Sequence, residues 1–225
     1  YLGNQATVLS VVGTHPLHHL VMGDLGQQGV AVADLNPTHP DLPPVSSIFV
    51  TASTGDRAVV SVNATQCQAT VDQIPPAILD GVNIVLIDGH QMAVGGAIAQ
   101  SAREQGIPVV VDGGSWKPGF ESVLRWADVV ICSANFHPPG GQSKREVFKY
   151  LADLGVPHRA MSQGNQPTLY ETPEATGSMP VPSIQPMDTL GAGDALHGAF
   201  CHFLLDAMRS EGNISSSSVV TALGQ

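Results

Sequence analysis

Short apolar runs alternate along most of this chain with segments whose apolar residues recur at helical spacing. The apolar runs are residues 8–12, 83–87, 108–111 and 128–132, and the helical segments are residues 18–28, 93–105 and 143–154. Uninterrupted Val and Ile runs are typical of strands buried on both faces, and the helices between them supply the crossovers of a parallel sheet. The pattern predicts an α/β fold with helices layered on both sides of a mainly parallel central sheet.

Polar residues follow three of the predicted strands. In a parallel sheet, ligands bind at the carboxyl ends of the strands. The loops that begin at Asp88, Asp112 and Ser133 are therefore expected to face one site.

Residues 45–64 break the alternation, because they contain no helical segment. Thr54, Gly55 and Asp56 lie between two runs rich in β-forming residues, which is typical of a hairpin. The Pro-rich residues 36–44 precede it as a linker. We predict a single domain over residues 1–225, with residues 45–64 inserted as a small β lid.

The composition narrows the classes of partner. The net charge of −10 argues against a nucleic-acid groove, which needs a basic stripe. No run approaches the ~20 apolar residues of a membrane span, so no membrane partner is expected. The cysteines are three in number and widely spaced, which favours buried free thiols and a cytoplasmic location.

The strongest chemical signal is the segment 188–194, Asp-Thr-Leu-Gly-Ala-Gly-Asp. Residues 191–193 form a small-residue turn before a predicted helix over residues 195–209, and small side chains let backbone amides approach a ligand. A helix N-terminus directs unpaired N–H groups and a partial positive charge at the same place. From the spacing alone, Asp194 is either a general base for a substrate hydroxyl or an N-cap.

The longer string DTLGAGDALHGAF, residues 188–200, resembles the phosphoryl-transfer motif of the ribokinase (pfkB) family of carbohydrate kinases, with its ketohexokinase-like branch as one option. The resemblance implies a ribokinase-like fold with Asp194 as general base. It also implies that the amides of Gly191, Ala192 and Gly193 form an anion hole for the transferring phosphoryl group. Asp188 and the carbonyl of Leu190 become candidates for a monovalent cation site, such as K⁺, although Asp188 is alternatively a turn residue.

Other segments agree with the family in order and spacing. Residues 111–117 resemble its strand-end loop, and residues 131–136 occupy the place of its Asn-x-x-Glu region, although Pro138 stands where the Glu is usual. The resemblance assigns Asn135 to magnesium and triphosphate. Ser162 and Gly164 resemble its Thr-x-Gly phosphate turn.

Arg57, in the lid, is either a phosphate clamp or a solvated side chain. His197 shares a helix face with Asp194, so it either lines the site or packs the helix, and the packing role is favoured. Residues 13–16 depart from the usual Gly-x-Asp, and both ends of the chain look truncated relative to the family.

These observations predict an ATP- and Mg²⁺-dependent kinase that phosphorylates a hydroxyl of a sugar or sugar-like alcohol. Two alternatives stay open. One is a degenerate family member that binds nucleotide or a protein partner without turnover, and the other is a kinase for a nucleoside or a vitamin precursor. A homodimer through the lid is a further expectation. The chain has no GxxxxGK[ST] loop, no HRD or DFG motif and no GxGxxG after a strand, which disfavours other nucleotide enzymes.

Overall fold

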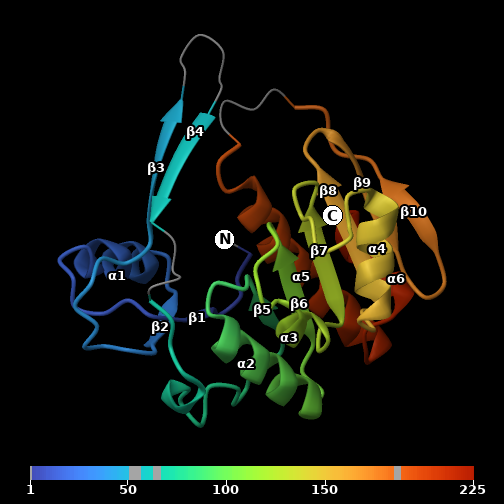
Figure 1. Cartoon of the computed structure of the whole chain (residues 1–225). Coiled ribbons are helices and arrows are strands. Elements are labelled where there is room, and N and C mark those ends of the chain that lie inside the picture. The colour runs from blue at the N-terminus through green and yellow to red at the C-terminus, as the bar shows by residue number, and fades with distance from the viewer. Residues whose placement is uncertain (1, 51–56, 63–66, 185–188) are drawn as a thin grey trace. The chain divides into compact units, whose positions relative to one another are not determined.

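A computed structural model describes residues 2–50, 57–62, 67–184 and 189–225. The contacts between residues divide the chain into two compact units. The larger unit comprises residues 79–225 with the first two residues, and the smaller unit comprises residues 3–78. Each unit is described by itself (Figure 1). The prediction of one domain with a lid stays a prediction.

The larger unit is built on a six-stranded sheet with the strand order β10-β9-β8-β7-β6-β5. Neighbouring strands from β5 to β8 run parallel, while β9 is antiparallel to β8 and β10 is antiparallel to β9. The predicted parallel sheet is thereby confirmed in this unit. The strands are β5 (Val85–Ile87), β6 (Val109–Gly113), β7 (Val129–Ser133), β8 (His158–Gln163), β9 (Gln166–Glu171) and β10 (Thr176–Met179).

Helices cover both faces of this sheet, as Figure 1 shows. Helices α5 (Ala192–Glu211) and α6 (Ser216–Leu223) pack on one face, where Phe200 and Leu204 meet Val110 and Ile131. Helices α2 (Met92–Glu104), α3 (Glu121–Leu124) and α4 (Lys144–Asp153) lie on the other face. Because both faces are covered, the central strands are apolar at consecutive positions, and their valines are fully buried.

The smaller unit contains two separate strand pairs. Strands β1 (Thr7–Ser10) and β2 (Ala31–Asp34) pair in parallel, and helix α1 (His18–Gln27) connects them. Strands β3 (Val45–Val50) and β4 (Arg57–Val62) pair antiparallel, as the predicted hairpin requires. The predicted turn at residues 54–56 lies outside the described residues. A 3₁₀ helix, η2 (Val71–Gln73), follows near the end of the unit.

Asp34, the last residue of β2, joins the loop that follows β1 to the loop that follows β2. Its carboxylate accepts backbone hydrogen bonds from Val12 (3.1 Å), Gly13 (3.0 Å) and Asn36 (3.0 Å). Gly13 has φ +69°, and a Cβ atom at this position would lie 2.2 Å from the carbonyl oxygen of His39. Only glycine fits here, because this close approach leaves no space for a side chain.

Candidate active site

The site is organised by the start of α5, where the sequence predicts the catalytic motif. Gly191 is the N-cap of this 20-residue helix and has φ +74°, the left-handed conformation that glycine adopts without strain. Asp194 lies in the first turn and is exposed. The N-cap is therefore Gly191 and not Asp194, so the side chain of Asp194 remains available to a ligand.

The turn before the helix leaves space around its small residues. The amide of Ala192 donates to the carbonyl of Thr189 (3.2 Å), and the carbonyl of Gly191 accepts from Ala195 (2.8 Å). A Cβ atom added at Gly193 would meet nothing within 4 Å. Amides in the first turn of a helix have no partner within the helix. The backbone of Gly193 is therefore open to an approaching anion.

A pocket of about 220 Å³ lies beside this helix start. It brings together the ends of β5 and β6 with the first turn of α5, so the loops after Asp88 and Asp112 do face one site, as predicted. The pocket residues are Asp88, His90, Asp112, Gly114, Ser115, Lys117 and Asp194. Of the predicted catalytic residues, Asp194 is the one whose side chain lines this pocket.

Aromatic side chains join the loops next to the pocket residues. Trp116 makes ring contacts with Phe120, Phe136 and Tyr150, at centroid distances of 6.2, 5.8 and 5.6 Å. Phe120 and Phe136 are fully buried. These contacts tie the loop after β6 to the loop after β7, which fixes the residues that project into the pocket.

Negative charge dominates the pocket, since three of its residues are aspartates. Burial raises the pKa of Asp112 above its usual value of 3.8, and the nearby carboxylates of Asp194 and Asp88 raise it further. His197 and Lys117 act in the opposite direction on the Asp112 pKa. Lys117 also donates from Nζ to the carbonyl of Asp88 (3.1 Å), so it links the β5 and β6 ends.

His197 lies one helical turn after Asp194 and is 5% exposed. Its Nδ1 atom is 2.7 Å from the carbonyl oxygen of Gly193 and 3.5 Å from Oδ2 of Asp112, and its Nε2 atom is 3.1 Å from the carbonyl oxygen of Ile131. The predicted packing role is compatible with this burial. The polar contacts, however, connect the helix start to the ends of two strands.

The predicted nucleotide residues lie at the same edge of the sheet. Ser133 and Ser162 are paired in the register of β7 and β8. The hydroxyl of Ser133 donates to the carbonyl of Gly114 (2.7 Å) and accepts from the amide of Asn135 (3.1 Å). Gly164 has φ +62° in the two-residue turn between β8 and β9, as a type II′ turn requires. Asn135 and Gly164 are both exposed.

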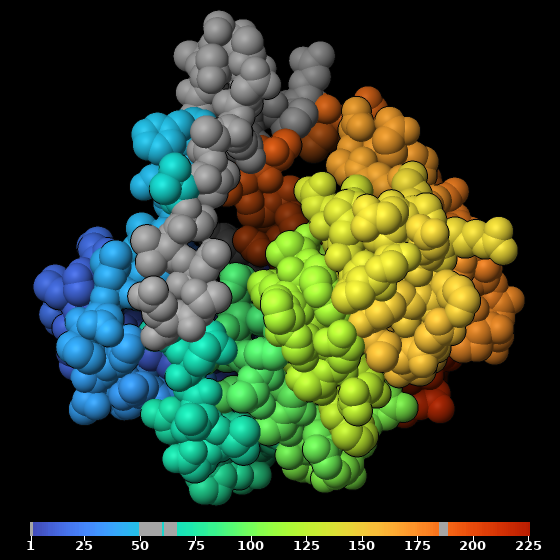
Figure 2. Space-filling view, viewed as in Figure 1, coloured from blue at the N-terminus to red at the C-terminus, as the bar shows by residue number. Residues whose placement is uncertain are grey.

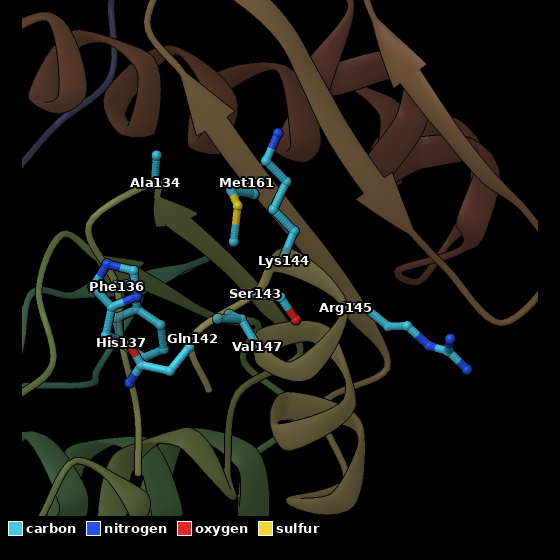
Figure 3. Close-up of a pocket in the computed structure, with 9 residues that line it drawn as sticks. All are labelled: Ala134, Phe136, His137, Gln142, Ser143, Lys144, Arg145, Val147 and Met161. Carbon is cyan, nitrogen blue, oxygen red and sulfur yellow. The ribbon is translucent and has the colours of Figure 1, made fainter. Parts of the chain in front are cut away.

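A second and larger pocket, of about 490 Å³, lies beside the N-terminus of α4 (Figure 3). Phe136, Val147 and Met161 give it an apolar wall, and the chain segments around it lie at the surface of the larger unit (Figure 2). The side chain of Arg145 extends away from the other labelled residues. The remaining lining residues are Ala134, His137, Gln142, Ser143 and Lys144.

The N-terminus of α4 is closed by its own side chains. The hydroxyl of Ser143 accepts from the amide of Glu146 (3.3 Å), and the carboxylate of Glu146 accepts from the amides of Gln142 (3.0 Å) and Ser143 (2.8 Å). These bonds lower the pKa of Glu146, with the Ser143 amide as the largest cause. This capping box occupies donors that would otherwise bind an anion, so the larger pocket is a poor phosphate site.

Some predicted site residues cannot be placed with the others. Asp188 lies outside the described residues, as does the side chain of Arg57. Leu190 is described, and its side chain is 63% exposed. Sequence reasoning did not assign His90 to the site, although it follows a predicted strand end, where a ligand is expected. Lys117 belongs to residues 111–117, the segment whose resemblance to the family's strand-end loop places it near the active site.

Within the described ranges, no group of three or more His, Cys, Asp or Glu side chains is placed to hold a metal ion. Mg²⁺ commonly binds through substrate phosphates and waters, with one or two protein ligands. A site that offers only one or two side-chain ligands therefore fits a Mg²⁺ ion that enters with a nucleotide. The described helices include none that is long and apolar enough to cross a membrane.

Comparison with known proteins shows the family of this chain. Residues 1–222 match the model of the pfkB family carbohydrate kinases. No curated protein is matched by the sequence.

Among solved structures, ribokinase from Giardia lamblia has a TM-score of 0.77 at 16% identity, over 97% of this chain and 74% of that chain. Adenosine kinase from Schistosoma mansoni in complex with 2-fluoroadenosine has a TM-score of 0.74 at 15% identity, over 96% and 71%. An E. coli protein described as a ribokinase II, in complex with ATP and Mg²⁺, has a TM-score of 0.73 at 18% identity, over 98% and 75%. These structures share the ribokinase-like fold of this chain.

Proposed function

The chain belongs to the pfkB family of carbohydrate kinases, and we propose that it transfers the γ-phosphoryl group of ATP to a hydroxyl of a sugar or sugar-like alcohol. Asp194 takes the proton from that hydroxyl. The oxygen then bonds to the γ-phosphorus, the bond to the β,γ-bridging oxygen breaks, and ADP leaves. The amides of Gly191 and Gly193 face the charge on the transferring group, and the amide of Ala192 joins them when it leaves the Thr189 carbonyl that accepts it here.

The observation that carries this proposal is the place of Asp194. Its carboxylate lines the 220 Å³ pocket and lies in the first turn of the helix whose N-cap is Gly191. A base and an anion-binding helix start are thereby within one turn of each other, so the attacked phosphorus and the departing proton can share one small space. The open space at Gly193 supports the approach of a phosphoryl group.

For the nucleotide, we assign the triphosphate to Ser162 and Gly164 at the turn after β8, with Arg57 as a clamp from the hairpin. Mg²⁺ would neutralise charge on the β- and γ-phosphate oxygens when it is bound. The side-chain oxygen of Asn135, at the same edge, is our candidate protein contact for it. A K⁺ site formed by Asp188 and the Leu190 carbonyl stays a prediction.

The hairpin supports the predicted homodimer through the lid. Phe49 and Val60 are 62% and 64% exposed. The pairs Phe49–Ala58 and Ser47–Val60 lie on one face of the two-stranded sheet, because directly opposed residues share a face. Light scattering on the full chain measures this expectation, and a monomer at all concentrations contradicts it. The predicted cytoplasmic location is likewise a proposal.

The test is release of ADP over a panel of sugars, nucleosides and phosphosugars. We expect turnover with a sugar, and a loss of about 10³-fold in kcat in Asp194→Asn, within the range for a general base. Asp206→Asn is the matched control, because Asp206 lies on the same helix and pairs with Arg209 at 2.7 Å, outside the pocket.

Full activity of Asp194→Asn would contradict the mechanism. Turnover with nucleosides alone would favour the nucleoside kinase. Binding of ATP without ADP release from any alcohol would favour the degenerate family member.

A further inference from the structure

His197 is a buried polar side chain that phosphoryl transfer, as described above, does not use. Within the described residues, both of its ring nitrogens lie close to oxygen atoms. Nδ1 lies 2.7 Å from the Gly193 carbonyl and Nε2 lies 3.1 Å from the Ile131 carbonyl. Both distances are those of ordinary hydrogen bonds.

These two neighbours decide how many protons the ring carries. A carbonyl oxygen only accepts hydrogen bonds, and a neutral imidazole has one N–H group. In either neutral tautomer, one ring nitrogen would direct its lone pair at a carbonyl oxygen. The imidazolium form donates to both oxygens, so it is the form that satisfies both contacts.

A buried positive charge requires a compensating negative charge. Asp112 supplies it, since its Oδ2 atom lies 3.5 Å from Nδ1, and the side chains of His197 and Asp112 are 6% and 22% exposed. The Cα atoms of Asp112 and Ile131 are partners in the register of β6 and β7. The ring of His197 therefore contacts β6 and β7 at a position where the two strands are paired.

Other titratable groups surround this pair. Asp88 and Lys117 reach Asp112 from the ends of β5 and β6, and Asp194 reaches it from α5. Cys132 on β7 interacts with it electrostatically, and burial raises the pKa of the Cys132 thiol and of the Cys201 thiol on α5 to about 12. Both thiols are therefore neutral near pH 7, and Asp112 is the anion closest to the ring.

We propose that His197 is a buried imidazolium, paired with Asp112, that positions the first turn of α5 for phosphoryl transfer. It fixes the Gly193 carbonyl against the end of β7, and with it the neighbouring amides and Asp194. Its catalytic part rests on the proposed kinase function. The charge of the ring and its contacts are independent of that function.

The charge of the ring also bears on nucleotide binding. The pocket presents Asp88, Asp112 and Asp194 to a triphosphate that is itself strongly anionic. A cation beside Asp112 reduces this repulsion over a few ångströms, in a site where the interaction is weakly screened. Loss of the cation therefore leaves a partly buried carboxylate uncompensated next to the anion hole.

The first experiment measures the ring directly in the full chain. Nitrogen-15 NMR distinguishes a ring with two N–H groups from either neutral tautomer, and the signal is assigned by its loss in His197→Gln. We expect two protonated nitrogens at pH 7 in the wild type. We also expect a neutral ring in Asp112→Asn at the same pH. A neutral ring in the wild type, or a ring still fully protonated in Asp112→Asn, overturns the proposal.

The second experiment separates positioning from general stability. In His197→Gln we expect kcat to fall about 10²-fold, the cost of a small misplacement of reacting groups, while KM for the alcohol changes less than threefold. The control is His202→Gln, because His202 also faces an aspartate on α5, with Nε2 3.6 Å from Asp206. This control is expected to keep kcat within twofold of the wild type.

An unchanged kcat in His197→Gln, or an equal loss in His202→Gln, overturns the positioning role. The two experiments distinguish failure of the kinase proposal from failure of this inference. A chain that releases no ADP with any alcohol refutes the function, while the NMR result still decides whether the ring is charged. An active enzyme with a neutral His197 refutes this inference alone.

Discussion

Asp34 and Asp112 occupy similar places, each near the carboxyl end of a strand in a parallel pair, yet their surroundings differ. In the smaller unit, the Asp34 carboxylate accepts three backbone N–H groups, which hold two loops together. In the larger unit, Asp112 faces a pocket, two other carboxylates and the ring of His197. A carboxylate whose oxygens accept several backbone amides is structural, whereas one that faces a pocket, with a histidine and a lysine nearby, can act on a ligand.

One glycine of each unit shows a similar contrast. Gly13 and Gly191 both have positive φ. A Cβ at Gly13 would overlap the backbone of His39, whereas a Cβ at Gly191 would have no neighbour closer than 3.8 Å, an oxygen of Asp194. The first glycine permits close packing of the chain on itself, and the second keeps space beside the proposed base.

The largest expected effect is in Gly13→Ala. The overlap at 2.2 Å adds to left-handed strain, so we expect a loss of about 4 kcal/mol in unfolding free energy, the size of the most severe single substitutions. Gly191→Ala should cost only about 1–2 kcal/mol of strain. The loss of unfolding free energy in Gly13→Ala is measured by hydrogen exchange at the amide of Leu35, which donates to the carbonyl of Ser10 in the smaller unit. Equal losses of unfolding free energy in Gly13→Ala and Gly191→Ala would contradict the difference between the two glycines.

Asp34→Ala should be the next most damaging substitution. Three backbone donors lose their acceptor, at about 1 kcal/mol each, so the unfolding free energy should fall by about 3 kcal/mol. Asp41→Ala is the matched control, because Asp41 is 79% exposed and lies 3.9 Å from His39. Urea unfolding with the Leu35 amide as reporter measures both variants. A loss below 1 kcal/mol in Asp34→Ala would show that the three bonds are not structural.

Gly193→Ala should separate activity from stability. Alanine stabilises a helix relative to glycine by about 0.5–1 kcal/mol, and no atom obstructs the new methyl group. That methyl group enters the space proposed for the phosphoryl group, so kcat should fall about 10²-fold, as for loss of one anion-hole donor.

Gly198→Ala, on the same helix and equally unobstructed, is the control and should keep kcat. An unchanged kcat in Gly193→Ala would argue against an anion hole at this turn.

The smallest effect concerns pH. Burial raises the pKa of Asp112 above 3.8, so the folded chain holds this proton more tightly than the unfolded chain. The resulting stability is present below pH 3.8 and is lost as the pH rises through the folded pKa. Asp112→Asn lacks this proton, so its stability relative to the wild type should increase over that window. Urea unfolding at several pH values tests this, and a constant difference contradicts it.

The sequence predicts the larger unit well where its pattern is simple. The runs at residues 108–111 and 128–132 become β6 and β7, because strands covered on both faces are apolar at every position. Strands β9 and β10 were not predicted. They lie at the antiparallel edge of the sheet, and their sequences, QPTLYE and TGSM, have neither a continuous apolar run nor a clear alternation.

The candidate site was predicted in part. The start of α5, with Gly191 and Asp194, could be predicted because its residues are close together in the sequence. The pairing of His197 with Asp112 was missed, since it joins distant segments through tertiary packing, and helical spacing alone predicts burial of the ring. Asp188 and the side chain of Arg57 lie outside the described residues, so their predicted roles stay predictions.

The capping box at Ser143 has a consequence for where an anion can bind. Helices α4 and α5 belong to the same unit, and each has an N-terminus of the kind that attracts phosphate. At α4, the Glu146 carboxylate acts as a tethered competitor for an anion, because it accepts the amides of Gln142 and Ser143. At α5, the matching carboxylate is that of Asp194, which lines the pocket, and Gly191 at the N-cap has no side chain. The carboxylate at α4 is thus bound to amides of its own chain, whereas the one at α5 faces the pocket that we propose for the substrate.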